Sequence, residues 1–131
     1  MTLNLVLRTL TLVCCLGLTI PAISQTGHPA KGSWSGEMGP NAAETSRVRL
    51  LIDAWNGELS GTVNPGRRGV EMSSVELDAD TWTLTIRAPM PDGELVLEGK
   101  LSNLGSWTNR KYVGTYTIGS EERGSFDITL N

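Results

Sequence analysis

From residue 32 to residue 131, apolar and polar residues alternate in short runs that are separated by turn-forming residues. Val48, Leu50 and Ile52, for example, alternate with Arg47 and Arg49. A period of two is typical of strands that bury one face and expose the other. Turn signals recur about every ten residues, as in all-β sandwiches and barrels. The pattern therefore predicts an all-β fold with eight antiparallel strands: Gly32–Met38, Ser46–Asp53, Glu58–Asn64, Val70–Asp78, Thr81–Ala88, Glu94–Leu101, Lys111–Ile118 and Arg123–Leu130.

The fourth of these strands changes its parity halfway. The apolar residues 70 and 72 share one parity, whereas the apolar residues 75 and 77 share the other. A β-bulge adds one residue to a strand and so moves the following side chains to the opposite face. We therefore predict a bulge at Ser73-Ser74 that returns both apolar pairs to the inner face.

The inner face predicted in this way combines mid-strand glycines with large aromatic residues. Gly61, Gly99 and Gly114 share the apolar parity, and a glycine within a strand marks a sharp bend or a close approach of two backbones. Trp34 and Trp82 lie within predicted strands and are expected in the core. Glycine bends and short connections favour an up-and-down barrel, which leaves no unpaired sheet edge. A β-sandwich is the alternative.

The first 24 residues have the pattern of a secretory signal peptide. Arg8 is followed by a mainly apolar run over residues 10–20 and by the small-residue site Ala22-Ile23-Ser24. That run is short for a membrane span. We expect cleavage after Ser24, a disordered lead-in over residues 25–31 and a single barrel domain over residues 32–131. The mature protein would then be secreted or periplasmic, with no stable membrane span.

Cleavage would change both the redox chemistry and the charge of the chain. Cys14 and Cys15 would leave with the signal, so the mature chain would have neither a disulfide nor a thiol. Loss of Arg8 leaves ten basic against fourteen acidic side chains, a net charge of −4. This acidic balance argues against a nucleic-acid partner.

The sequence contains little that indicates catalysis. It has no Gly-x-Ser-x-Gly nucleophile motif and no metal-ligand spacing, and no cysteine nucleophile would survive cleavage. His28 is the only histidine, and no cluster of ligand-type residues accompanies it. Carboxylates within the predicted strands have the solvent-facing parity. We therefore expect no metal, no cofactor and no catalytic residue, with a loop-built isomerase or hydrolase as an alternative.

The connections between strands carry the candidate binding residues. In a meander, alternate connections share one end of the barrel, which brings Trp55, on the Asn56-Gly57 turn, to the same end as Trp107. Asp80 and Arg110 belong to the same end. Two aromatic rings flanked by polar groups suit a contact site for a small, largely apolar ligand or for a protein partner. Alternatively, the two tryptophans fold over the barrel end and close it.

The opposite end carries paired charges. Arg67 and Arg68 follow a Pro-Gly turn signal, and Glu121, Glu122 and Arg123 form a second charged group. Paired arginines suit carboxylate or phosphate recognition. Ordinary solvated turn charges are the alternative interpretation.

Short motifs at both ends of the domain carry a family resemblance. Gly32-Ser33-Trp34, a strand rich in Arg and Val, and Leu59-Ser60-Gly61-Thr62 together resemble the opening of avidin-like and lipocalin-like (calycin) barrels. Gly114-Thr115-Tyr116 with Gly124-Ser125-Phe126 is similar to small exported bacterial β-proteins of no assigned function. The resemblance covers most of the mature chain and implies a ligand cup or a packed barrel. It does not imply biotin binding, because the polar residues that surround the ureido ring in avidins have no counterparts here.

These observations lead to one functional hypothesis and two alternatives. The hypothesis is an exported, non-catalytic β-barrel that binds a small, largely apolar ligand or a protein partner. The first alternative is a solid-core structural or accessory subunit that acts through its surface. The second is the loop-built enzyme.

Overall fold

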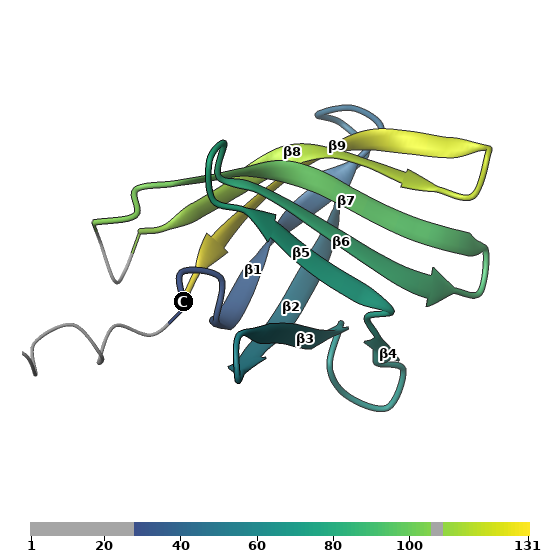
Figure 1. The fold of residues 1–131 in the computed structure, drawn as a ribbon. Coiled ribbons are helices and arrows are strands. Elements are labelled where there is room, and N and C mark those ends of the chain that lie inside the picture. Colours follow the sequence, from purple (N-terminus) through teal and green to yellow (C-terminus); the bar gives the residue numbers. More distant parts are fainter. Residues whose placement is uncertain (1–27, 106–108) are drawn as a thin grey trace, which may run out of the picture.

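The computed structural model describes residues 28–105 and 109–131. Within these ranges the chain forms nine strands and no helix (Figure 1). The expected signal peptide lies outside the described residues. The strands are β1 (Gly32–Gly39), β2 (Ser46–Trp55), β3 (Glu58–Val63), β4 (Val70–Glu71), β5 (Ser74–Asp78), β6 (Thr83–Met90), β7 (Gly93–Ser102), β8 (Lys111–Ile118) and β9 (Glu122–Leu130).

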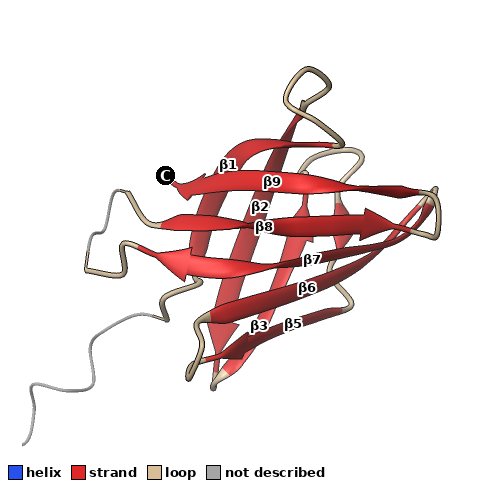
Figure 2. Cartoon of the chain, turned by 90° about the horizontal axis from the view of Figure 1, so that it is seen from above, coloured by secondary structure: helices blue, strands red, loops and turns tan. Residues whose placement is uncertain are grey.

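All nine strands belong to one antiparallel sheet with the order β4-β3-β2-β1-β9-β8-β7-β6-β5. Apart from the pairing of β1 with β9, every paired strand is bonded to a neighbour in sequence, which is the connectivity of an up-and-down meander. Figure 2 shows the strands curving strongly around a common interior. The prediction of an all-β, up-and-down antiparallel fold is thereby confirmed. The curled sheet keeps two edges, β4 and β5, so it does not have the edge-free pairing expected of a complete barrel.

The predicted fourth strand is divided between the two edges of the sheet. Its first part, β4, pairs with β3, and its second part, β5, pairs with β6. At the junction the Met72 N–H donates to the Gly61 carbonyl (2.9 Å) and the Ser73 N–H donates to the Arg87 carbonyl (2.7 Å). Ser74 is the register partner of Arg87, so two consecutive residues oppose one, as in a β-bulge. The predicted bulge lies where expected, and it takes the chain from one sheet edge to the other.

The buried residues follow the predicted alternation. Inward-facing side chains come from all the long strands, and three aromatic rings fill the middle of the interior. The ring of Tyr112 lies 6.3 Å from that of Trp34 in an edge-on arrangement and 4.6 Å from that of Phe126. The Tyr112 hydroxyl donates to the Leu84 carbonyl (2.7 Å), so its one polar group is satisfied. The core placement of Trp34, which is fully buried, is confirmed.

The core placement of Trp82 is wrong. Trp82 is 36% exposed, and its backbone φ of 56° lies in the left-handed region. The chain turns over residues 79–82, and Asp78 accepts the Asp80 N–H through its side chain (3.0 Å) as in an Asx-turn. β6 therefore begins at Thr83. Trp82 has the same parity as the buried Leu84, but it belongs to the turn before β6 and not to the strand.

Candidate functional site

Three of the sequence-predicted site residues, Trp55, Asp80 and Arg110, lie at one end of the sheet, which we call the covered end. This end comprises the turns at residues 56–57 and 79–82 together with residues 103–105 and 109–110, on the left in Figure 1. Trp55 is 77% exposed beside the Asn56-Gly57 turn, whose two residues both have positive φ. Asp80 is exposed in its turn. Trp107 lies outside the described residues.

Arg110, in contrast, is buried, with only 7% of its surface exposed. Its guanidinium donates to the carbonyls of Pro29 (2.8 Å) and Leu104 (3.0 Å). It thus joins the segment before β1 to the connection between β7 and β8. The side chain that the sequence suggested as a binding group is engaged in holding this end together.

Residues 28–31, the end of the expected lead-in, contribute to the same cover. Ala30 is completely buried, and its carbonyl accepts the indole N–H of Trp34 (2.9 Å). Leu104 is partly buried and packs against the core as well. A buried tryptophan needs a hydrogen-bond partner for its indole N–H. Residues 28–31 supply that partner for Trp34 through the Ala30 carbonyl.

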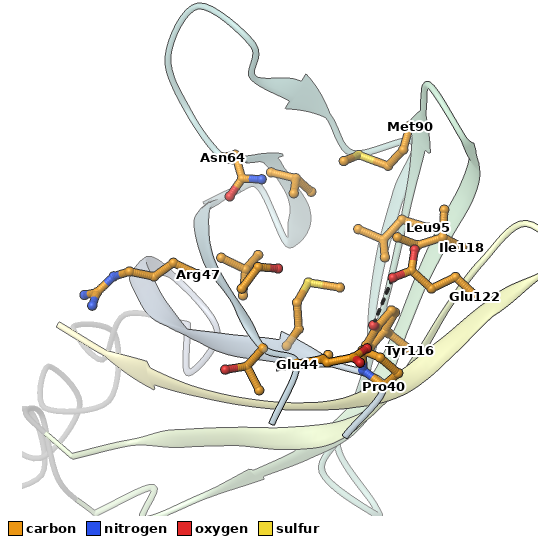
Figure 3. A pocket seen from close by; sticks show the side chains of 15 residues that line it. Pro40, Glu44, Arg47, Asn64, Met90, Leu95, Tyr116, Ile118 and Glu122 are labelled. Carbon is orange, nitrogen blue, oxygen red and sulfur yellow. Dashed lines mark hydrogen bonds between the residues drawn. The ribbon is translucent and has the colours of Figure 1, made fainter. Parts of the chain in front are cut away.

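The opposite end, which we call the open end, has a hollow of about 440 Å³. This volume lies within the range of small-molecule sites in proteins. Its walls come from seven strands, β1, β2, β3, β6, β7, β8 and β9, and from the connections after β1 and β3. The apolar lining consists of Met38, Val48, Val63, Met90, Leu95, Tyr116 and Ile118 (Figure 3).

The inward-facing residues at this end include one small side chain and two flexible ones. Ser46 has the inward parity of β2 and is part of the lining. The Met38 and Met90 side chains at this end are half-buried. Methionine is flexible and adapts to ligands of different shape.

Glu122 is a lining residue of the hollow for which the sequence predicted no binding role beyond its place in the charged group of residues 121–123. β9 begins one residue earlier than predicted, and Glu122 shares the inward parity of Gly124 and Phe126. Among the described strands it is the one charged residue with that parity. The sequence alone could have indicated this orientation, because Glu122 has the same parity as the inward-facing residues of β9 up to Leu130.

The Tyr116 hydroxyl faces this carboxylate. It donates to Glu122 Oε1 at 3.5 Å, a long hydrogen bond, and Tyr116 itself is 2% exposed (Figure 3). Burial, the negative charge of Glu122 and the hydrogen bond together raise the pKa of Tyr116. The hydroxyl therefore keeps its proton at neutral pH. Tyrosine and glutamate form a polar pair on an otherwise mainly apolar wall.

Two loops complete the rim of the hollow. In the connection after β1, the Asn41 side chain accepts the Glu44 N–H (3.0 Å), and this turn brings Glu44 to the lining. After β3, the Asn64 side chain accepts the Arg49 N–H (3.0 Å). Arg67 and Arg68 belong to the same connection but are not part of the lining.

A second hollow of about 460 Å³ lies where β3 and β5 diverge, beyond the bulge. It includes His28 and Glu58, Ser74 and Glu76, so its lining is more polar. Burial lowers the pKa of His28, whose Nδ1 accepts the Ala30 N–H (3.1 Å). His28 thus has a local structural role, because its ring nitrogen accepts a backbone hydrogen bond within a turn.

Within residues 28–105 and 109–131, no group of three His, Cys, Asp or Glu side chains lies close enough together to hold a metal ion. No helix in that part of the chain is long and apolar enough to cross a membrane.

No protein-family model, curated protein or solved structure matches this chain.

Proposed function

We propose that this protein is an exported, non-catalytic β-barrel that holds a small, largely apolar ligand in the hollow at its open end. The observation that supports the proposal most directly is the hollow itself, about 440 Å³ in volume, with Met38, Met90 and Leu95 in its walls. Burying a ligand's apolar surface there is favourable by roughly 25 cal/mol per Å² before the cost of immobilisation. A solid-core subunit would have no use for such a space.

The proposal includes the calycin-like relationship and export through the secretory route. Its support is the curled, meandering sheet and the signal-like pattern of residues 1–24. The expected mature protein begins at or near Gln25, and N-terminal sequencing of exported protein tests this. Recovery of the chain with Met1 intact would refute export by signal cleavage.

Binding is tested with the neutral, environment-sensitive dye Nile red, titrated into the mature protein. We expect its fluorescence to rise and saturate. Met90→Trp adds volume to the half-buried wall of β6 and should weaken dye binding by about tenfold or more, equivalent to about 1.4 kcal/mol.

The matched control is Leu51→Trp, on the outer face of β2, where the native side chain is 47% exposed. It introduces the same aromatic group away from the hollow and should bind the dye as the wild type does. Absence of saturable binding to the wild type would overturn the proposal. Equal affinities of Met90→Trp and the wild type would place the dye elsewhere and would also overturn it.

A further inference from the structure

We infer that the ligand of the open-end hollow carries a cationic, hydrogen-bond-donating head group, of the alkylammonium class, which is held by Glu122. The inference deepens the proposed function and depends on it. It starts from the position of Glu122, the exposed first residue of β9, whose inward parity and place in the lining put its carboxylate at the rim of the hollow.

The side chains at this site offer acceptors more than donors. Glu122 and Glu44 contribute carboxylates to the lining, and the Tyr116 hydroxyl already directs its proton to Glu122. The hydroxyl oxygen retains lone pairs that can accept a further hydrogen bond. An ammonium group has three donors and no acceptor, so it complements this arrangement.

Among the described residues, the lining contains one positively charged side chain, and it does not face the site at which an ammonium group would bind. Arg47 is the only lysine or arginine among the described lining residues. It belongs to the outward parity of β2, and in Figure 3 its guanidinium extends away from Tyr116, Glu122 and Leu95. An anionic head group would therefore meet carboxylates without a facing cation.

The apolar walls define the rest of the ligand. Leu95 lies level with Glu122 in the strand register, because both are aligned with Ile118. Val48 and Val63 lie farther from the open end, so a ligand with its head at the rim would place an apolar tail inward. The ligand that fits this geometry is an amphiphile with a short apolar body, rather than a purely hydrocarbon molecule.

The test compares octylamine, octanol and octanoate, which share one chain length and differ in head-group charge. Each competes with Nile red for the mature protein at neutral pH and physiological salt. We expect octylamine to displace the dye at a concentration at least about tenfold lower than octanoate, with octanol between them.

Glu122→Gln keeps the size of the side chain and removes its charge. It should reduce the preference for octylamine over octanol at least about fivefold, an effect typical of losing a charge-assisted hydrogen bond. Glu121→Gln is the matched control, because this exposed neighbour is absent from the lining and its removal changes the net charge equally. Physiological salt screens exposed charges beyond about 8 Å, so Glu121→Gln should retain the preference.

The outcomes separate this inference from the proposed function. Saturable Nile red binding combined with equal or better competition by octanoate would overturn the cationic head group and leave the apolar site standing. Retention of the octylamine preference in Glu122→Gln, or its equal loss in Glu121→Gln, would overturn the role of Glu122. Failure of the dye to bind at all would instead refute the site itself.

Discussion

Replacement of Gly99 by alanine tests whether the curvature of the sheet depends on a glycine on its inner face. Gly99 pairs directly with Gly114 in the register of β7 and β8. A Cβ added at Gly99 would lie 2.5 Å from the Val113 carbonyl oxygen and 2.8 Å from Phe126 Cζ. Ordinary van der Waals contact begins about 3.4 Å away, so both neighbours would have to move.

The magnitude follows from two opposing effects. Overpacking of a well-packed interior costs roughly 1–3 kcal/mol, and the upper part of this range applies because one neighbour is backbone. The loss of glycine's freedom in the unfolded chain returns roughly 0.4–1 kcal/mol. We therefore expect Gly99→Ala to lower the free energy of unfolding by about 2 kcal/mol, and the melting temperature by roughly 8–16 °C for a domain of this size.

Urea denaturation followed by tryptophan fluorescence measures the change. Gly105→Ala is the matched control, because nothing lies within 4 Å of its Cβ position and its φ is not positive. Its stability should stay within about 0.5 kcal/mol of the wild type. A Gly99→Ala protein as stable as the control would refute the argument that the sheet bends tightly at this position.

Three further predictions concern the covered end and the core. Trp55→Ala should change the free energy of unfolding by less than about 0.5 kcal/mol, since the residue is exposed. Arg110→Ala should lower it by about 2 kcal/mol, since two carbonyls lose their donor; equal effects in urea titrations would contradict the structural role of Arg110. Burial, followed by the charge of Glu98, raises the pKa of Tyr112, so the folded chain keeps a phenolic proton that the unfolded chain releases. Stability should therefore fall as pH rises above about 10, less steeply in Tyr112→Phe, and a pH series that shows equal slopes would count against this.

The sequence by itself determined the features that depend on local backbone geometry. Strict alternation identified the inward-facing residues, because successive side chains of a strand point to opposite faces. The parity change before Val75 located the bulge, since one extra residue is the local means of restoring a face. The Asn56-Gly57 turn was recognisable because both residues tolerate positive φ.

Tertiary structure decided what depends on the whole interior. The hollow is walled by residues from seven strands, and no single strand contains the information that they enclose a space together. Trp82 and Arg110 show that the burial of a residue also depends on the whole fold. A turn placed the apolar Trp82 at the surface. The charged Arg110 is buried, where it donates to the carbonyl of the distant Pro29 and to that of Leu104 in its own connection. Periodicity reports the face on which a side chain lies, and only the folded chain sets which backbone groups it meets there.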